Sequence, residues 1–276
     1  MHACSVARPA GMYPPGAMNC RPETITASGN SFCRALILAA GRGRRMGIEV
    51  PPKALLRFGG NSLLARHLAI LDACGVRQVA ITIGYRSPDL RNEVARHERS
   101  GSVALIENLS FRDGSIVSLW HGRDVLRSGV PILLMDADVL YDRRLIMRLL
   151  DSPHENVFLL DREIEPGEEP VKLCIDNGRI VDFHKRPQHG HQWHGESVGF
   201  FRFSPGVAAE LADRVEGYVM AGRTDLEYEE PIRDMVLAHE ARDFGFDDIS
   251  GLPWIEIDFP EDVQRAEAAV LPNLIA

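Results

Sequence analysis

The sequence carries no excess of positive charge and no long apolar run. Its 276 residues include 31 Lys and Arg against 39 Asp and Glu, which gives a formal net charge of −8 at pH 7. A global basic field of the kind that binds nucleic acid is therefore excluded, although a local basic site is not. No apolar run approaches the ~18 residues that a membrane-spanning helix needs. We therefore expect a soluble protein that has neither nucleic acid nor a membrane as a partner.

Cysteine is scarce and unpaired in the sequence. The cysteines form no CxxC pair and number five: Cys4, Cys20, Cys33, Cys74 and Cys174. This pattern argues against a disulfide framework and against a cysteine zinc site, and it predicts a cytoplasmic protein. Residues 1–31 are rich in Pro, Gly, Ser and Ala and lack the apolar segment of a secretory signal. We expect them to form a disordered tail, followed by one folded domain over residues 32–276.

Strands and helices alternate along the first half of the sequence. Apolar runs predict strands at residues 34–40, 79–83, 103–106 and 131–135, and helical periodicity predicts helices at residues 61–73, 88–98 and 115–126. His67 falls on the apolar stripe of the first helix, where we expect a core histidine without a function. The alternation is typical of an α/β fold in which helices cover both faces of a mostly parallel sheet.

The second half of the sequence is less regular. Short apolar runs predict strands at residues 156–160, 171–175, 180–183 and 197–203, and Asn177-Gly178 predicts a hairpin turn. A helix is expected at residues 231–239. A last strand at residues 254–258 leads to a terminal helix that begins at Pro260.

A glycine-rich turn after the first predicted strand forms the first candidate site. The segment runs from Leu38 to Met46 and reads LAAGRGRRM. Gly41 and Gly43 let backbone N–H groups approach phosphate oxygens closely, because a Cβ would obstruct that approach. A triphosphate also requires positive charge while pyrophosphate departs. The basic side chains available for this are Arg44, Arg45 and Lys53.

Other phosphate-binding motifs fit this turn less well. A dinucleotide-binding fingerprint would not displace its third glycine to Gly47, and it would include an acidic residue ~20 positions onward. A Walker loop would end in Gly-Lys-Ser or Gly-Lys-Thr, which this segment lacks. An ordinary strand–turn–helix connection with surface arginines is the structural alternative.

Asp136 and Asp138 follow the strand predicted at residues 131–135. Residues two apart share one side of a strand, and the carboxyl edge of a parallel sheet is where ligands bind. Magnesium favours a few carboxylates together with phosphate oxygens and water. The pair is therefore a candidate metal site, with solvated aspartates at a strand end as the alternative.

A third candidate lies in the late segment Trp254-Ile-Glu-Ile-Asp258. Alternation along a strand places Trp254, Glu256 and Asp258 on one face. Asp258 stands at the strand end and is a candidate for the second carboxylate on the metal. The alternative is an N-cap acid in front of the helix at Pro260.

Together these segments resemble the nucleotidyltransferase superfamily that activates sugar and alcohol phosphates. The combination of LAAGRGRRM with PKAL carries the resemblance, which extends from Arg34 to Ala269. It implies a Rossmann-like (GT-A-like) mixed sheet between helices, with a small β-rich insertion that binds the acceptor. It also implies magnesium on Asp138 and Asp258, and Arg45 and Lys53 as the catalytic pair. The nucleotide-binding residues that it implies are Leu38, Ala39, Ala40, Gly41, Gly43, Arg44, Gly84, Tyr85, Gly114, Ser115 and Asp136.

Finer features resemble the branch that uses CTP and acts on phosphocholine, aminoethylphosphonate or inositol phosphate. These features are Asp113-Gly-Ser-Ile-Val-Ser-Leu119, Glu196-Ser-Val-Gly199, Tyr228-Glu-Glu-Pro-Ile-Arg-Asp234 and the segment that contains Asp258. Many relatives carry Asn at the position of Ser115, which leaves the base contact open. No aromatic residue stands near Val171, where the phosphocholine enzymes offer a cation–π contact, and this argues against choline.

The resemblance places the acceptor pocket in the second half of the chain. Lys185 and Arg186 are candidates to hold the acceptor phosphate or phosphonate. The acidic and aromatic set of Glu196, Tyr228 and Glu229 suits an ammonium group, although the acidic run is also typical of a helix start. The histidines of the same region predict a solvated or substrate-binding loop rather than zinc, since no acid or cysteine completes a ligand set; they are His184, His189, His191 and His194.

The resemblance therefore implies a magnesium-dependent cytidylyltransferase that transfers CMP from CTP to a small phosphonate or phosphorylated alcohol and releases pyrophosphate. An inositol-phosphate or sugar-1-phosphate nucleotidyltransferase is the nearest alternative. A glycosyltransferase with a DxD motif and a nucleotide-binding regulator without catalysis are alternatives of another class. The sequence leaves the acceptor and the oligomeric state open, with a homodimer as one alternative.

Overall fold

The computed structural model describes residues 33–47, 50–97, 102–164, 169–239 and 243–275. The tail expected at residues 1–31 lies outside the described residues. Of Arg44 the structure describes the backbone and not the side chain.

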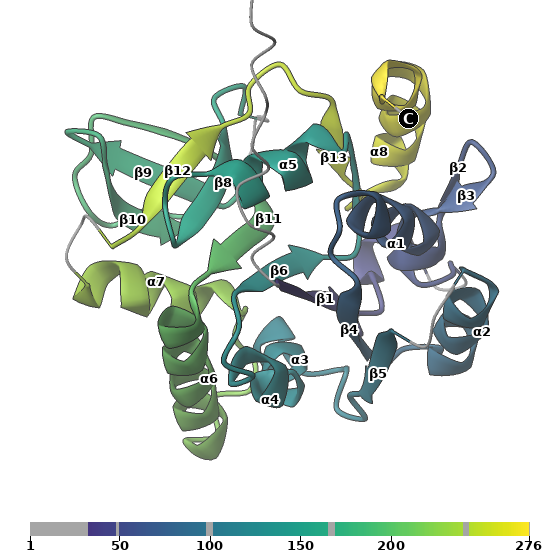
Figure 1. Cartoon of the computed structure of the whole chain (residues 1–276), viewed down its shortest axis with the longest axis horizontal. Coiled ribbons are helices and arrows are strands. Elements are labelled where there is room, and N and C mark those ends of the chain that lie inside the picture. Colours follow the sequence, from purple (N-terminus) through teal and green to yellow (C-terminus); the bar gives the residue numbers. More distant parts are fainter. Residues whose placement is uncertain (1–32, 48–49, 98–101, 165–168, 240–242, 276) are drawn as a thin grey trace, which may run out of the picture. The chain divides into compact units, whose positions relative to one another are not determined.

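The centre of the fold is a mixed sheet with the strand order β10-β9-β11-β6-β1-β4-β5 (Figure 1). Its parallel part comprises β1 (Arg34–Ala39), β4 (Gln78–Ile83), β5 (Val103–Glu107) and β6 (Ile132–Asp136). The chain runs from β1 to β4 and β5 on one side and returns to β6 on the other. The order of the strands reverses at β1, and such a switch point opens a crevice at the carboxyl ends of the strands.

The second half extends the sheet with antiparallel strands. They are β8 (Val157–Asp161), β9 (Lys172–Asp176), β10 (Arg179–His184) and β11 (Trp193–Phe203), and β12 (Gly245–Asp248) pairs in parallel with β8. The long β11 joins the two halves, because it pairs with β6 at one end and with β9 at the other. The hairpin turn predicted at Asn177-Gly178 connects β9 to β10 and is confirmed, with φ angles of 49° and 73°.

Helices cover both faces of the sheet, so the predicted fold class is confirmed. One face packs against α1 (Leu63–Ala73), α2 (Ser87–His97) and α5 (Arg144–Asp151). The other packs against α3 (Ser115–His121), α4 (Arg123–Leu126), α6 (Pro205–Met220) and α7 (Glu229–Ala238). Alternate residues of the strands enter the two cores; Ile37 faces the first and Leu36 the second.

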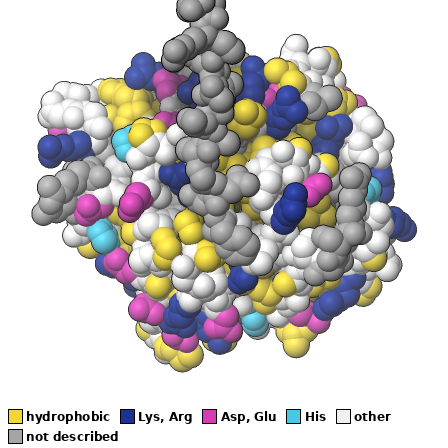
Figure 2. Space-filling model, in the orientation of Figure 1, with side chains coloured by type: hydrophobic (Ala, Val, Ile, Leu, Met, Phe, Trp, Pro, Cys, Tyr) yellow, Lys and Arg dark blue, Asp and Glu magenta, His cyan; other side chains and the backbone are white. Residues whose placement is uncertain are grey.

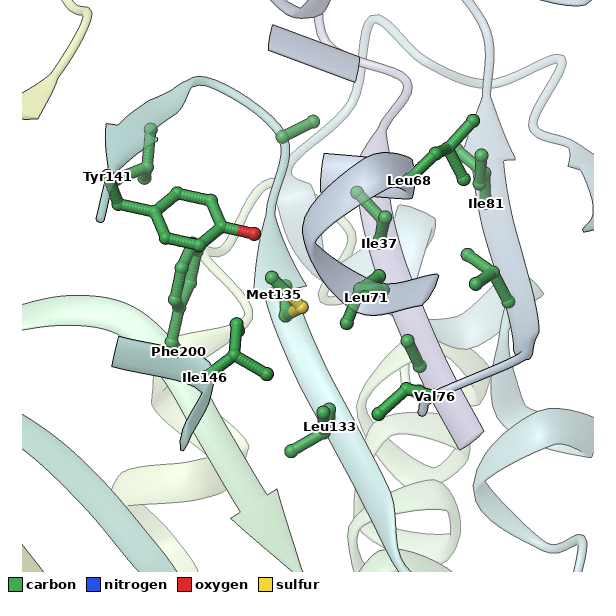
Figure 3. Close-up of a cluster of buried hydrophobic side chains, with 14 of the residues drawn as sticks. Ile37, Leu68, Leu71, Val76, Ile81, Leu133, Met135, Tyr141, Ile146 and Phe200 are labelled. Carbon is green, nitrogen blue, oxygen red and sulfur yellow. The ribbon is translucent and has the colours of Figure 1, made fainter. Parts of the chain in front are cut away.

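Figure 3 shows the first of these cores, where Leu68 and Leu71 of α1 lie over Ile37 of β1. His67 is completely buried beside this core, and its Nδ1 lies 3.2 Å from the hydroxyl of Tyr141. Burial lowers the pKa of His67 to about 4, so the ring is neutral at physiological pH. The predicted core position of this histidine is confirmed.

A short antiparallel pair and a terminal helix stand beside the sheet. The pair consists of β7 (Val139–Tyr141) and β13 (Trp254–Glu256), and α8 (Pro260–Arg265) follows. Ile255 and Ile257 are buried in a third apolar cluster, as the predicted alternation requires. The remaining short elements are η1 (Arg44–Met46), η2 (Lys53–Leu55), β2 (Arg57–Phe58), β3 (Asn61–Ser62), η3 (Ala266–Val270) and η4 (Leu271–Asn273).

The predicted helices and strands are present, but the structure differs from the prediction in an interrupted helix, in the bounds of some elements and in elements that were not predicted. The helix expected at residues 115–126 is interrupted at Gly122, and the strand expected at residues 254–258 ends at Glu256. The helix expected at residues 61–73 begins at Leu63, because Ser62 caps it by accepting a hydrogen bond from the Ala65 amide. The sequence analysis missed β2, β3, β7, α5, α6 and β12.

Acidic, basic and hydrophobic side chains are interspersed over the described part of the face shown in Figure 2. Across the described ranges of the chain, no helix combines the length and the apolar character needed to cross a bilayer.

Candidate active site

Parallel pairing brings the candidate loops to one edge of the sheet. Leu38 of β1 lies opposite Asp136 of β6, and Ala39 lies opposite Ile83 of β4. The glycine-rich turn, the Asp136–Asp138 segment and Gly84-Tyr85 therefore start side by side, although they are far apart in the sequence. This edge is the switch-point crevice in which ligands bind in open α/β sheets.

A pocket of about 210 Å³ opens at this edge. Its lining contains the backbone of the glycine-rich turn together with Lys53, Asp136 and Asp138. Phe111, which the sequence analysis did not select, also lines it, as does Asp113, the first residue of the segment Asp113–Leu119 named for the CTP-using branch. Predicted nucleotide-binding residues among its walls are Leu38, Ala39, Ala40, Gly41, Gly43, Ser115 and Asp136.

Of the other predicted nucleotide-binding residues, Gly84, Tyr85 and Gly114 support this pocket from outside its walls. The amide of Tyr85 donates a 3.0 Å hydrogen bond to the carbonyl of Ala40. A Cβ on Gly84 would lie 3.0 Å from the same carbonyl. The amide of Gly114 donates to the carbonyl of Thr224 at 2.7 Å, and this bond joins the start of α3 to the segment before α7.

Three carboxylates and one lysine meet beside the pocket. Oxygens of Asp138, Glu256 and Asp258 all lie within 4.8 Å of one another. The ammonium nitrogen of Lys53 lies 2.9 Å from Oδ2 of Asp138 and 2.6 Å from Oδ1 of Asp258. A hydrogen bond from the Ile257 amide to the Asp138 carbonyl (3.0 Å) brings the two distant segments together.

The donor set fits a divalent cation. Carboxylate oxygens from two or three acids are the ligands that magnesium prefers, with phosphate oxygens and water in the other positions. Among the described residues, this is the one group of three acids, histidines or cysteines with such spacing. The structure therefore places Asp138 and Asp258 together, as the proposed metal site requires, and adds Glu256.

The charged groups in this cluster shift one another's pKa values. Burial opposes the charged form of Lys53, but the carboxylates of Asp138 and Asp258 outweigh it and raise the pKa of Lys53 above its ordinary value. Burial likewise opposes the charged form of Asp258, while Lys53 and Arg45 lower the pKa of Asp258. Desolvation and repulsion from the two aspartates raise the pKa of Glu256 well above its ordinary value. Because Glu256 is open to the cavity, repulsion matters more than desolvation there.

Arg45 connects this cluster to the second half of the chain. Its guanidinium group lies 2.9 Å from Oδ2 of Asp258 and 2.6 Å from Oε2 of Glu169. Glu169 also lies 3.3 Å from the ammonium group of Lys185, which is 2.9 Å from Glu227. A chain of alternating charges thus runs from the glycine-rich turn to the start of α7.

A second pocket of about 200 Å³ lies on the other side of the aspartates. It shares Ser115, Asp136 and Asp138 with the first pocket. Of the residues predicted to bind the acceptor, Lys185, Tyr228 and Glu229 line it. Arg186 and Glu196 do not: Arg186 is exposed, and Glu196 is buried and lines a neighbouring groove.

Glu229 brings to the second pocket a carboxyl group with one oxygen that lacks a hydrogen-bond partner. The Oε2 atom of Glu229 is buried and has no hydrogen-bond partner. Burial and the neighbouring Glu227 raise the pKa of Glu229 to about 8. Glu229 is also the first residue of α7, so the expected acidic helix start is present as well.

Three aromatic residues stand around the same pocket as Val171. They are Phe183, Phe201 and Tyr228, which come from β10, β11 and the residue before α7. Their side chains are buried in the second apolar core, so the argument against choline stays a prediction.

The histidine-rich loop makes internal contacts. His189 donates to the buried carboxylate of Asp182 at 3.0 Å, His184 lies 3.1 Å from Glu230, and His191 lies 3.0 Å from His194. In the part of the chain that the structure describes, these rings do not form a group with metal-ligand spacing.

Comparison with known proteins agrees with this geometry. Residues 35–182 match the family described as MobA-like NTP transferase domain. A bifunctional IPC transferase and DIPP synthase of Rubrobacter xylanophilus is 26% identical over 250 residues, which cover 88% of this chain and 53% of that protein. A CMP-5'-(3-aminopropyl)phosphonate synthase of Streptomyces rubellomurinus is 27% identical over 256 residues, which cover 87% of this chain and 39% of that protein. The chain thus spans only part of the length of these relatives.

The fold also matches solved structures. The CTP:phosphocholine cytidylyltransferase of Streptococcus pneumoniae superposes with a TM-score of 0.70 and 19% sequence identity, over 85% of this chain and 97% of that protein. The family match covers more than half of the present chain, including the glycine-rich turn, Lys53 and the Asp136–Asp138 segment. The chain therefore belongs to the MobA-like NTP transferase domain family and is a nucleotidyltransferase.

Proposed function

We propose that the protein transfers CMP from CTP to a small phosphonate or phosphorylated alcohol and releases pyrophosphate. The observation that carries the proposal is the pair of pockets that share Ser115, Asp136 and Asp138. One pocket offers the glycine-rich backbone and Lys53 to a triphosphate. The other offers Lys185 and Glu229 to a zwitterionic acceptor.

In this proposal the first pocket holds the nucleotide by its phosphates. Gly41 and Gly43 leave the backbone open to phosphate oxygens, since a Cβ would block the approach. Arg45 and Lys53 neutralise charge as pyrophosphate departs. A magnesium ion held by Asp138 and Asp258, with Glu256 close by, would supply Lewis-acid stabilisation of the phosphate oxygens.

The acceptor needs no general base, because its phosphate or phosphonate already carries an anionic oxygen at neutral pH. Lys185 would hold this anion and aim its oxygen at the α-phosphorus of CTP. The shared walls at Asp136 and Ser115 keep the two substrates adjacent, so that much of the rate enhancement comes from positioning.

We further propose that the acceptor carries an ammonium group. Oε2 of Glu229 is a buried oxygen without a hydrogen-bond partner, which costs free energy, and a ligand cation would satisfy it. The similarity to a CMP-5'-(3-aminopropyl)phosphonate synthase supports this acceptor class. The likeness in fold to an inositol-1-phosphate CTP transferase of T. maritima supports inositol phosphate as the second candidate.

The scattered cysteines support the cytoplasm as the compartment of this reaction. The described cysteines, Cys33, Cys74 and Cys174, are free thiols.

Pyrophosphate release tests the proposal. The purified protein would be assayed with each of the four nucleoside triphosphates, magnesium and a panel of acceptors. The panel contains 2-aminoethylphosphonate, 3-aminopropylphosphonate, phosphocholine, inositol 1-phosphate and glucose 1-phosphate. We expect release with CTP and an aminoalkylphosphonate, its loss in Asp138→Ala, and its retention in Asp72→Ala, which alters an exposed aspartate on α1. Release with another nucleotide, or with glucose 1-phosphate as the one active acceptor of the panel, would contradict the proposal.

A further inference from the structure

Lys53 lies in the position that a metal ion between Asp138 and Asp258 would take. Its ammonium nitrogen lies 2.9 Å from one carboxylate and 2.6 Å from the other. The side chain is only 14% exposed, and each aspartate side chain is 22% exposed. The lysine therefore neutralises two carboxylates whose repulsion in a partly buried site would otherwise be costly.

The stem of Lys53 also contacts the glycine-rich turn. A Cβ on Gly43 would lie 2.9 Å from Cγ of Lys53, so the stem passes directly beneath the backbone that faces the nucleotide pocket. A triphosphate bound along this turn would attract the ammonium group away from the aspartates, since the triphosphate carries more negative charge than the two carboxylates together.

We propose that Lys53 is a built-in counter-cation that blocks the metal site until a nucleoside triphosphate arrives, so that the divalent cation binds together with the nucleotide. The inference rests on the proposed function, because it assumes that Asp138 and Asp258 hold the cation during the reaction. It assigns Lys53 a second role, in the order of binding, besides its role with the leaving group.

The affinity of the free protein for the cation follows from this arrangement. A cation binds only to the fraction of molecules in which Lys53 has left the two carboxylates, and the apparent affinity falls by that fraction. Two short ion pairs hold the lysine in place, so we expect this fraction to be on the order of a tenth or less. The nucleotide removes the block by offering the lysine other anions.

The small number of lysines in the sequence provides a matched control for a test of this role of Lys53. The chain has three lysines, Lys53, Lys172 and Lys185. Lys172 donates to the backbone carbonyls of Lys185 (2.9 Å) and Pro170 (3.3 Å) and makes no contact with Asp138 or Asp258. Lys172→Met is therefore a matched control for Lys53→Met.

The first experiment measures manganese binding to the nucleotide-free protein by electron paramagnetic resonance. We expect Lys53→Met to bind Mn²⁺ about tenfold more tightly than the wild type, and Lys172→Met to bind it as the wild type does. Equal Mn²⁺ affinity of Lys53→Met and the wild type would overturn the inference while leaving the metal site intact. Absence of Mn²⁺ binding in all three proteins, even with a non-hydrolysable CTP analogue, would overturn the metal site itself.

The second experiment leaves Lys53 unaltered, so that it does not depend on the folding of Lys53→Met. Lysine labelled with ¹³C at Cε gives three signals, and Lys53 is identified as the one that is retained in both Lys172→Met and Lys185→Met. We expect Mg²⁺ alone at millimolar concentration to leave the Lys53 signal unchanged, and Mg²⁺ with α,β-methylene-CTP to shift it. A shift of the Lys53 signal with Mg²⁺ alone would contradict the inference.

Discussion

The hydroxyl of Tyr228 donates a 2.6 Å hydrogen bond to Oδ2 of Asp136. The amide of the same tyrosine donates a 2.9 Å bond to the hydroxyl of Ser115. Both acceptors line the wall between the two pockets. One residue at the start of α7 thus fixes two side chains that face the nucleotide pocket, although it lies about a hundred positions away in the sequence.

Removal of the Tyr228 hydroxyl should destabilise the protein. Tyr228→Phe leaves a buried oxygen of Asp136 without its donor, which costs about 1–3 kcal/mol. The measurement is the free energy of unfolding in urea. Tyr218→Phe is the control, because Tyr218 donates a 2.5 Å bond to Asp234 between α6 and α7, away from both pockets. The activity of both variants is measured as well. Equal losses of activity in Tyr228→Phe and Tyr218→Phe would contradict the role of Tyr228 in the site.

Gly199 leaves the space that the Asp136 carboxylate occupies. A Cβ on Gly199 would lie 2.1 Å from Oδ2 of Asp136, and the residue has a φ of +73°. We expect Gly199→Ala to displace the carboxylate and to lower kcat/KM on the order of 100-fold, as small misplacements in active sites do.

The variant Gly178→Ala is the control that distinguishes backbone strain from displacement of the Asp136 carboxylate. Gly178 has the same φ of +73°, but an added Cβ would meet nothing within 4 Å. The two variants share the backbone strain of about 1–2 kcal/mol, and Gly178→Ala should retain full activity. Inactivation of both variants would show that strain alone accounts for the effect.

The binding of an ammonium acceptor should improve as the pH rises toward 8. Glu229, whose pKa is raised to about 8, is protonated at pH 6 and must ionise to pair with a cation. Its ionised fraction rises almost tenfold per pH unit below that pKa. We therefore expect KM for 2-aminoethylphosphonate to fall from pH 6 to pH 8. The trend should be absent for 2-hydroxyethylphosphonate and in Glu229→Gln, and a matching trend in either would exclude Glu229 as its source.

Asp182 should determine how the histidine-rich loop responds to acid. It is fully buried and accepts hydrogen bonds from Arg233, from His189 and from the amide of Gln188. Burial opposes its charge, but these donors outweigh burial and lower the pKa of Asp182 below its ordinary value. A lowered pKa stabilises the fold above the ordinary pKa of ~4, and this stability is lost as the pH falls through the folded value.

We therefore expect Asp182→Asn to lose about 3–5 kcal/mol of unfolding free energy at pH 7. The deficit should shrink as the pH falls below 4. The control is Asp213→Asn, because Asp213 pairs with Arg127 at the surface, where such pairs contribute little. Urea unfolding at pH 3 and pH 7 checks both variants, and a deficit independent of pH would contradict the assignment.

The first half of the fold could be predicted because its strands are short apolar runs between clear turns. The pairing of Asp138 with Asp258, and the basic pair of Arg45 and Lys53, followed from the family resemblance, whereas the ion pair of Lys53 with Asp138 did not. Helix α6 was missed because small residues such as Ala208 and Ala212 form much of its buried stripe, and α5 has only eight residues.

The sequence analysis selected Lys185, Tyr228 and Glu229 on the acceptor side, but it could not predict how the side chains there pair. The contacts on this side join distant segments: Arg45 to Glu169, Lys185 to Glu227, and Tyr228 to Asp136. Glu256 is the exception, since strand alternation had already placed it on the face of Asp258. Local patterns carry information about strands and loops, whereas side-chain pairing across a pocket depends on tertiary packing.

The central claim is that CMP passes from CTP to an aminoalkyl phosphonate or phosphate. Phosphorus NMR of the reaction tests it most directly, because it identifies the bonds that form. With wild-type protein, magnesium, CTP and 2- or 3-aminoalkylphosphonate, we expect signals of a phosphonate–phosphate anhydride and of pyrophosphate in equal amounts, both absent in Lys53→Met. Unchanged CTP with every acceptor of the panel, or hydrolysis to CMP without a coupled product, would contradict the account.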